Sequence, residues 1–200
     1  MSILSLEERL GLAEKEIRKP SFRQKLGLTN DVPYYVFDYD AKDELIVRDR
    51  IKAWQAKNAK GNDAFSLIVY DLYDIVIDIL ESKGFLNKCF EFEEKKGMER
   101  IVNALGNLLQ INDEKSLIVK YIEDNTPSDA VVFLIGIGKC YPFLRSHKIL
   151  NNLHQAIDTV PVVMFYPGKY TGQELILFSE IKDDNYYRAF PLVARRKALS

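Results

Sequence analysis

Apolar residues recur every three or four positions in the first segment of the chain, which is the period of an amphipathic helix. These positions are Ile3, Leu6, Leu10, Ala13 and Ile17. Ser5, followed three residues later by Glu8, predicts a capping box, in which each side chain bonds a free backbone N–H. The pattern therefore predicts a helix that begins after Ser5 and ends before Pro20.

The rest of the chain alternates between strand-like and helix-like patterns. Runs rich in β-branched and aromatic residues predict strands, and most are followed by a run of helical period. The predicted strands cover residues 32–37, 65–70, 130–135, 160–165, 175–178 and 187–193. The predicted helices extend from Asp40 to Gly61, from Asp71 to Gly84, through most of residues 85–125, and over residues 146–157.

Strands that alternate with helices predict an α/β fold, with a mainly parallel sheet and helices on both faces. The continuous apolar run over residues 130–135 is typical of a strand buried on both faces. We interpret the last two predicted strands, 175–178 and 187–193, as a hairpin at one sheet edge. We therefore expect about five to six strands in a single domain of residues 1–200, in which residues 85–125 could form a helical insertion.

Charge and cysteine content narrow the functional classes. The 200 residues carry 28 Lys plus Arg and 29 Asp plus Glu, a net charge of -1. Nucleic-acid binders usually carry a strong positive excess, so direct DNA binding is not expected. Cys89 and Cys140 are too few for a disulfide framework or zinc site, which predicts reduced thiols. No apolar run has the length of a secretion signal or a membrane span, so we expect a cytoplasmic protein.

The loop after the buried strand is the first place to look for chemistry, because α/β sheets bind ligands at the carboxyl ends of strands. Gly136, Gly138 and Lys139 suggest a phosphate loop. A P-loop, however, needs glycine where the chain has Phe133, and Ser or Thr where it has Cys140. The dinucleotide-binding pattern Gly-x-Gly-x-x-Gly does not match either, because its third glycine would fall at Tyr141. The favoured interpretation is a glycine turn, and phosphate binding at this loop is the alternative.

Acidic residues also gather at the ends of two predicted strands. Asp38 and Asp40 follow the first, and Asp71 and Asp74 follow the second. Converging carboxylates could hold magnesium or act as acid and base, so a metal-dependent hydrolase or nuclease is a second alternative. Asp40 and Asp71 also precede predicted helices, where aspartate is a favoured N-cap. Capping is the favoured interpretation.

The two histidines do not form a recognisable site. His147 and His154 are seven residues apart, on nearly the same helix face but two turns from each other. One metal ion needs closer ligands, and no Gly-x-Ser-x-Gly elbow is present to hold a nucleophile. We therefore predict no catalytic residue, no metal site and no cofactor, and a structural or interface role for His147.

Two loops, over residues 166–173 and 183–188, combine turn-forming residues with tyrosines and charges. Tyrosine and arginine are enriched at protein interfaces, because they offer large rigid surfaces with polar tips. Each loop is interpreted either as an interface or as an ordinary turn with half-buried tyrosines. The candidate residues are Tyr166, Gly168, Tyr170, Asp183, Asn185, Tyr186 and Arg188.

Several blocks of the chain form a set of motifs that is specific when the blocks are taken together. The blocks are Gly136–Gly138, Tyr141–His147, Leu150–Leu153, Pro33–Tyr39, Phe165–Tyr170 and Lys182–Phe190. In these blocks the chain resembles the BrxB family, a bacterial family known mainly as a domain of unknown function, whose members include the small B component of BREX phage-resistance systems. The likeness extends from about residue 5 to residue 193, and Lys139-Cys140 departs from the small or apolar pair expected after the glycines.

The resemblance implies a role in BREX, in which a set of proteins methylates host DNA and blocks phage replication. It also implies a non-catalytic component, because the methyltransferase, the large ATPase and the phosphatase-like PglZ carry the recognisable catalytic domains. We therefore expect an adaptor that binds another BREX component, with PglZ as the first candidate, and that reaches DNA at most through the complex. The residues expected to form or support its contact surface are Arg145, Ser146, His147, Asn151 and Asn152, with the Tyr166 and Tyr186 turns.

Overall fold

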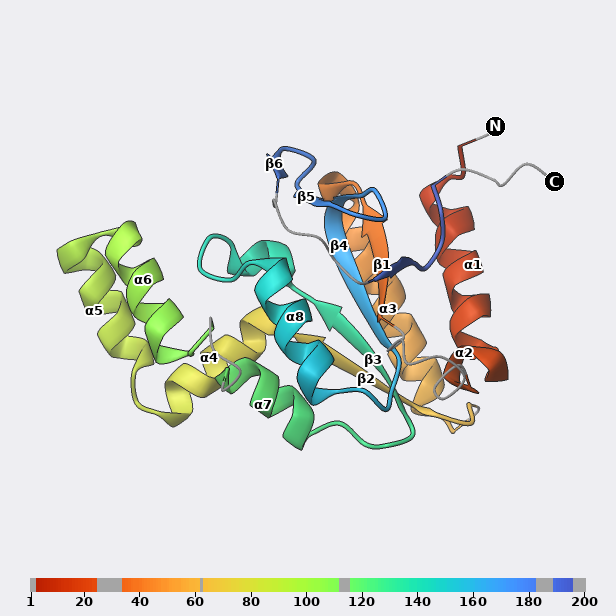
Figure 1. Ribbon diagram of the computed structural model, residues 1–200, viewed down its shortest axis with the longest axis horizontal. Coiled ribbons are helices and arrows are strands. Elements are labelled where there is room, and N and C mark those ends of the chain that lie inside the picture. Colours follow the sequence, from red (N-terminus) through yellow and green to blue (C-terminus); the bar gives the residue numbers. More distant parts are fainter. Residues whose placement is uncertain (1–2, 25–33, 62, 112–115, 183–188, 196–200) are drawn as a thin grey trace. The chain divides into compact units, whose positions relative to one another are not determined.

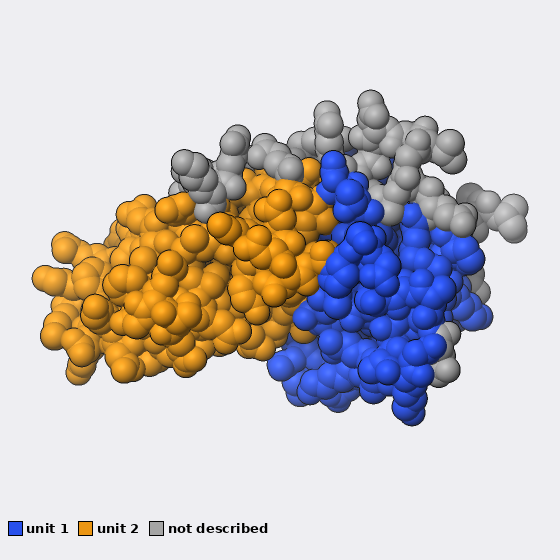
Figure 2. All heavy atoms as spheres, turned by 90° about the horizontal axis from the view of Figure 1, so that it is seen from below, with its two compact units in different colours: residues 1–69, 127–133, 158–200 blue, residues 70–126, 134–157 orange. Residues whose placement is uncertain are grey.

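The computed structural model describes most of the chain (Figure 1). The described residues are 3–24, 34–61, 63–111, 116–182 and 189–195, without the side chains of Ser146, His147 and Gln155. The chain divides into two compact units, coloured separately in Figure 2. Unit 1 comprises residues 1–69, 127–133 and 158–200, and unit 2 comprises residues 70–126 and 134–157. The single domain expected from the sequence stays a prediction, and residues 85–125 lie wholly in unit 2.

The predicted first helix is confirmed as α1, Leu6–Arg18. Its capping box forms as expected, because the Ser5 N–H donates to Glu8 at 2.8 Å and the Glu8 N–H donates to the Ser5 hydroxyl at 3.2 Å. A short helix, α2, follows over Pro20–Gln24. The buried face of α1 carries Arg9 beside the apolar residues Leu10, Ala13 and Ile17.

Helix α3, Glu44–Asn58, runs beside α1 in unit 1. Lys57 of α3 donates to Glu14 of α1 at 2.9 Å. The Trp54 ring of α3 packs on the rings of Phe133 and Phe165, with centroid distances of 6.0 and 6.3 Å. Phe165 also lies 5.5 Å from Phe37, ring centre to ring centre, so aromatic side chains of neighbouring strands form one layer of the core.

Over the described residues the sheet has seven strands, and the predicted mainly parallel α/β fold is confirmed. Its strands are β1 Tyr34–Tyr39, β2 Ser66–Asp71, β3 Ala130–Ile135, β4 Val162–Tyr170, β5 Leu175–Leu177, β6 Ile181–Lys182 and β7 Phe190–Pro191. The main path has the order β2-β3-β4-β1-β7. Strand β1 pairs in parallel with β4, where Tyr34 faces Val162, and with β7, where Tyr35 faces Phe190. In β3, residues of both alternating sets are buried, as the apolar run predicts.

The C-terminal hairpin forms with a different second strand from the one predicted. Strand β5 pairs antiparallel with β4 and with β6, and β7 joins β1 in parallel. Phe178 and Ser179 have positive φ values of 53° and 63°, so the turn closes directly after β5. The pairing of β7 is extended by the Leu192 N–H, which donates to the Val36 carbonyl at 2.9 Å.

Unit 2 is mainly helical, and the predicted helical character of residues 85–125 is confirmed over the described part. Its helices are α4 Leu72–Ser82, α5 Leu86–Lys96, α6 Met98–Leu108, α7 Leu117–Asp124 and α8 Ser146–Ala156. Helix α4 ends before Gly84, which takes the left-handed conformation predicted for it, with φ of 67°. Among the described residues, no helix is both long and apolar enough to cross a bilayer.

Candidate functional site

The carboxyl ends of β1 and β4 in unit 1 hold a cluster of charged side chains around Asp38. Arg9 donates from Nη2 to Asp38 Oδ1 at 2.6 Å and from Nη1 to the Asp38 backbone oxygen at 2.5 Å. Arg195 donates from Nε to Asp38 Oδ2 at 2.7 Å. Each carboxylate oxygen of Asp38 therefore accepts from a different guanidinium. The side chains of Arg9 and Asp38 are only 5% and 9% exposed, so this ion pair is buried.

Arg195 extends the cluster to Asp40 and to the end of β4. Its Nη1 donates to Asp40 Oδ1 at 2.8 Å, and its Nη2 donates to the Gly168 carbonyl at 2.7 Å. Asp40 takes the N-cap position of the 3-10 turn η1, Ala41–Asp43, as predicted, but its side chain makes no capping bond. The guanidinium donor carries a full positive charge, whereas a backbone N–H is neutral, so the carboxylate bonds Arg195 instead of the helix start.

The charges of this cluster shift the ionisation of its members. The hydrogen bond from Arg195 lowers the pKa of Asp40 below its ordinary value. Burial lowers the pKa of Arg9 although Asp38 acts in the opposite direction, and both arginines stay charged because guanidinium titrates only far above neutral pH. Within the described residues, no group of three His, Cys, Asp or Glu side chains could hold a metal ion. Asp38 and Asp40 thus converge on an arginine.

The predicted interface residues of the β4 turn are built into unit 1. Tyr166 is fully buried. A Cβ at Gly168 would lie 2.1 Å from the Ile176 carbonyl oxygen, so only glycine lets β5 approach β4 here. Tyr170 donates its backbone N–H to Asp38 at 3.2 Å and its hydroxyl to the Ala189 carbonyl at 2.6 Å. These bonds connect the end of β4 to β1 and to the C-terminal segment.

A second strand-end carboxylate, Asp71, lies in unit 2. It caps α4 as predicted, because its Oδ1 accepts from the Tyr73 N–H at 3.0 Å. Its Oδ2 pairs with Lys139, whose Nζ also lies 3.7 Å from Asp74 and 5.3 Å from the centre of the Tyr73 ring. The charge of Lys139 is therefore engaged by two carboxylates, and a phosphate at this loop would have to displace them.

The glycine loop itself is shaped by Asp71. Gly136 has φ of 79°, and a Cβ there would lie 2.1 Å from Asp71 Oδ1. Gly138 belongs to the short 3-10 helix η2, Ile137–Cys140. Cys140 is buried, which raises the pKa of its thiol to about 12, so the thiolate that a nucleophile requires does not form at neutral pH. The loop has the geometry of a glycine turn that accommodates a helix cap.

The predicted contact residues around α8 divide into exposed and supporting positions. Arg145 precedes the helix in an extended conformation and is exposed, and so is Asn151. Asn152 donates to the Ile111 carbonyl at 3.3 Å and is half-buried. Ser146 and His147 lie in the first turn of α8, and their side chains fall outside the description. The candidates Asp183, Asn185, Tyr186 and Arg188 also lie outside the described residues.

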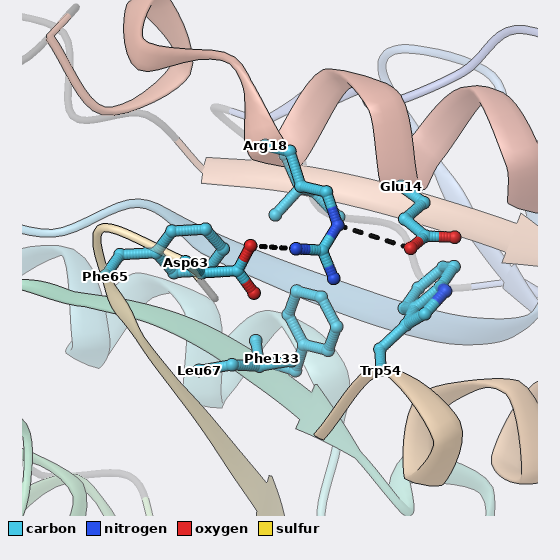
Figure 3. A pocket seen from close by; sticks show the side chains of 8 residues that line it. Glu14, Arg18, Trp54, Asp63, Phe65, Leu67 and Phe133 are labelled. Atoms are coloured by element: carbon cyan, nitrogen blue, oxygen red, sulfur yellow. Dashed lines mark hydrogen bonds and ion pairs between the residues drawn. The ribbon is translucent and has the colours of Figure 1, made fainter. Parts of the chain in front are cut away.

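Unit 1 contains one pocket that the sequence does not predict. Figure 3 shows Arg18 between the carboxylates of Asp63 and Glu14, with the rings of Phe133 and Trp54 beside it. Arg18 Nε donates to Glu14 at 3.2 Å and Nη1 donates to Asp63. The pocket is open to solvent on one side and is lined by Glu14, Ile17, Arg18, Trp54, Asp63, Phe65, Leu67 and Phe133.

The charges that face this pocket are balanced within it. Partial burial raises the pKa of Glu14, but the bond from Lys57 and the charges of Lys57 and Arg18 outweigh burial and hold the pKa below its usual value. Two carboxylates, Glu14 and Asp63, therefore face two cations, Arg18 and Lys57. The pocket offers no excess charge to a ligand, and its ion pairs join α1 to α3 and to the loop before β2.

The helical pair α5–α6 in unit 2 carries several large apolar side chains that are exposed. All residues from 90 to 100 are exposed, and helix α5 contains no buried residue. The large apolar side chains among them are Phe90, Phe92 and Met98, exposed by 59%, 38% and 56%. Exposed aromatic and methionine side chains are typical of surfaces that contact other proteins.

The sequence-based prediction missed Arg9 and Arg195, the two residues that organise the Asp38 cluster. A signal for Arg9 was present, because it lies three residues after Leu6 and four before Ala13, on the apolar face of the first helix. An arginine on a buried face requires a carboxylate partner. No comparable local signal marks Arg195, whose partners Asp38 and Asp40 lie 157 and 155 residues away.

Comparisons with known proteins give a consistent result. Residues 68–192 match the family model described as "BREX protein BrxB". A "BREX protein BrxB" of Bacillus cereus (strain H3081.97) is 46% identical over 188 residues, which cover 94% of this chain and 97% of that protein. A protein of the same description from Escherichia coli O9:H4 (strain HS) is 31% identical over 188 residues, which cover 94% of this chain and 92% of that protein. No solved structure matches the chain.

Proposed function

Because this chain belongs to the BrxB family of BREX proteins, we propose that it serves as a non-catalytic adaptor within a BREX phage-defence assembly. In this role it binds another BREX component, and PglZ is the first candidate. Contact with DNA is at most indirect, through the assembly. Membership of the family supports a role in BREX systems. The adaptor role is our inference from the site.

One observation carries the non-catalytic part of the proposal: the strand-end carboxylates are occupied by basic side chains of the chain itself. Asp38 and Asp40 accept from Arg195, and Asp71 pairs with Lys139. A general base or metal ligand needs lone pairs directed at a substrate or an ion. Here those lone pairs are directed at guanidinium and ammonium groups, which favours a structural role.

The exposed side chains of unit 2 supply a candidate contact surface. Among the candidate residues whose side chains are described, Arg145 and Asn151 are exposed, and Phe90 and Phe92 add exposed aromatic area on α5. Interface energy is concentrated in a few aromatic and arginine residues, so single substitutions should have large effects if this surface binds a partner.

The test is affinity purification of the tagged chain from a host that carries its neighbouring BREX genes. The variants are Arg145→Ala, Phe90→Ser and Tyr186→Ala, and the matched control is Lys52→Ala, whose side chain is 70% exposed on α3. We expect stoichiometric recovery of a BREX protein with the unchanged chain and the control, and loss of that protein with at least one folded variant. Recovery of the chain alone at every salt concentration would contradict the adaptor role.

Melting temperatures and activity of the same purified chain test the two alternatives, which are a phosphate-binding loop and a metal-dependent hydrolase or nuclease. A nucleotide or phosphate that binds at Gly136–Lys139 would raise the melting temperature, because a ligand at a hundred times its dissociation constant adds about 2.7 kcal/mol to the free energy of unfolding. A metal-dependent hydrolase would be stabilised by a divalent ion and would lose activity in Asp38→Ala. We expect neither response.

A further inference from the structure

Strand β2 forms one edge of the sheet, because it stands at the end of the strand order β2-β3-β4-β1-β7. The opposite edge, β7, is two residues long and includes Pro191, which has no N–H to donate. Strand β2 is six residues long, and its residues 66–70 carry neither a charge nor a proline. Edge strands are usually protected from pairing with other chains by short length, charge or proline. Residues 66–70 of β2 have none of these protections.

The hydrogen bonds of unit 1 show which backbone groups of β2 face away from β3. The Ser66 N–H donates to the carbonyl of Asp129, the residue directly before β3, at 3.4 Å. Because the backbone groups of a strand point alternately to its two sides, Ile68 also faces β3, whereas Leu67 and Val69 face outward. The Leu67 N–H confirms this direction, since its acceptor is a side chain of α3 and not a residue of β3.

That side chain, Asn58 at the end of α3, occupies the first part of the outer edge. Its Oδ1 accepts from the Leu67 N–H at 2.8 Å, and its Nδ2 donates to the Phe65 carbonyl at 2.9 Å. An amide that accepts and donates side by side mimics a peptide group of a neighbouring strand. The chain itself therefore supplies a substitute for a strand along Phe65 and the Leu67 N–H.

The outer edge beyond Asn58 has no hydrogen-bond partner among the residues that the structure describes. The unpaired groups are the Leu67 carbonyl, the Val69 N–H and the Val69 carbonyl. Residues Ser66–Val69 are all half-buried, whereas Ala130–Phe133 of β3 are all buried, so solvent reaches this edge. An acceptor, a donor and an acceptor in succession match the backbone of an extended chain.

We propose that the outer edge of β2 at Leu67 and Val69 is a β-augmentation site, to which the BREX partner adds an extended segment as a further strand. The segment donates N–H groups to the Leu67 and Val69 carbonyls and accepts from the Val69 N–H. Because Leu67, Ile68 and Val69 are apolar, a segment with β-branched or other apolar side chains fits best. This inference rests on the proposed adaptor role and names how the partner is bound.

Amide hydrogen exchange at single-residue resolution tests the proposal on the full chain, alone and recovered with its BREX partner. In the chain alone, the Val69 N–H should exchange at least about tenfold faster than the Ile68 N–H, which faces β3. In the complex, exchange at Val69 should slow by at least about tenfold, while Ile68 stays slow.

Three results of this measurement would overturn the proposal. Equal exchange at Val69 and Ile68 in the dilute chain alone would mean that the chain itself covers the edge. Slowing at Val69 as the chain alone is concentrated would assign the edge to a second copy of the chain. A recovered complex in which Val69 exchanges as fast as in the chain alone would place the partner elsewhere, and the adaptor role would stand.

Substitution of Val69 gives a second test by partner recovery. Val69→Pro removes the outward N–H, and proline is tolerated where the N–H of an edge strand faces outward. Val69→Thr is the matched control, because it keeps the N–H and the β-branched shape. We expect the partner to be recovered with Val69→Thr and lost with folded Val69→Pro. Full recovery with folded Val69→Pro would overturn the edge site alone, whereas no partner with the unchanged chain would contradict the adaptor role itself.

Discussion

The ends of β1 and β2 present the same chemistry in two different settings. Each strand carries an aspartate in its last two residues, and this aspartate accepts from a basic side chain far along the chain, Arg195 for Asp38 and Lys139 for Asp71. Asp38 and Asp71 are themselves similarly buried, at 9% and 13% exposed, but their cations differ. Asp38 also holds Arg9, which is 5% exposed, whereas the Lys139 side chain is 32% exposed and its second carboxylate, Asp74, is 70% exposed.

The two ion pairs differ in how well water can solvate the charge that remains when one partner is removed. Removing a partner from a buried pair leaves an uncompensated charge in a poorly solvated place, which is strongly destabilising. Removing a partner from an exposed pair lets water take over its role, at little cost. A strand-end aspartate thus becomes part of the core in unit 1 and an exchangeable helix cap in unit 2, although both positions look alike in the sequence.

The largest effect is expected from Arg9→Ala. It leaves Asp38 buried with one guanidinium fewer and removes the packing on Phe37, so the free energy of unfolding should fall by about 3–5 kcal/mol. Urea unfolding measures this loss. The matched control is Arg50→Ala, which breaks the surface pair with Glu7 and should cost at most about 1 kcal/mol. Equal losses for the two variants would contradict a buried role for Arg9.

Gly168→Ala should have the next largest effect. Its Cβ would meet the Ile176 backbone oxygen at 2.1 Å, so β5 must move, and we expect a loss of about 1–3 kcal/mol in urea unfolding. Gly106→Ala is the control, because no atom lies within 4 Å of its Cβ position in helix α6. That substitution should stabilise by up to about 1 kcal/mol. A neutral Gly168→Ala would mean that β5 does not pack as closely as described.

A smaller, pH-dependent effect is expected at Asp40. The folded-state pKa of Asp40 lies below the ordinary value of 3.8, so its carboxylate contributes stability above that pH and loses the contribution as pH falls through the folded-state pKa. The stability difference between the unchanged chain and Asp40→Asn should therefore be constant near neutral pH and shrink below about pH 3.8. Urea unfolding at a series of pH values measures it. Asp49→Asn, at an exposed pair with Lys52, is the control. A difference that does not vary with pH would count against the Arg195 bond.

The smallest effect is expected from Lys139→Ala. Asp71 is 13% exposed but keeps its bond from the Tyr73 N–H, and Asp74 is 70% exposed, so the free energy of unfolding should fall by only about 1 kcal/mol. If Lys139→Ala lowered the free energy of unfolding as much as Arg9→Ala does, the ion pairs at the ends of β1 and β2 would not differ in their contribution to stability. The measurement is urea unfolding of both variants side by side.

Local features of the fold could be predicted from the sequence because they depend on neighbouring residues. The capping box of Ser5 and Glu8, the cap at Asp71 and the left-handed Gly84 involve contacts over a few positions. The alternation of strands and helices then determines the α/β class.

The features that could not be predicted are long-range contacts. Asp40 has the sequence context of a helix cap, but the Arg195 guanidinium arrives from 155 residues away and takes its carboxylate. Likewise, the sequence pattern predicts a hairpin between β5 and the strand at β7, whereas β7 pairs with β1, more than 150 residues earlier in the chain. Neither periodicity nor a turn signal in the sequence indicates which distant residue will be the partner. The short basic run at Arg195 does not indicate that Asp38 is the carboxylate that Arg195 pairs with.

The central claim is that the chain contributes to BREX without carboxylate chemistry, and phage plating on cells that carry the complete system tests it most directly. The variant is Asp40→Asn/Asp71→Asn, which removes both charges while asparagine still caps α4. We predict that protection from phage persists at the level of the unchanged chain. Loss of protection, with the variant chain present at normal abundance and still recovered with its partners, would contradict the claim and assign the carboxylates a chemical role.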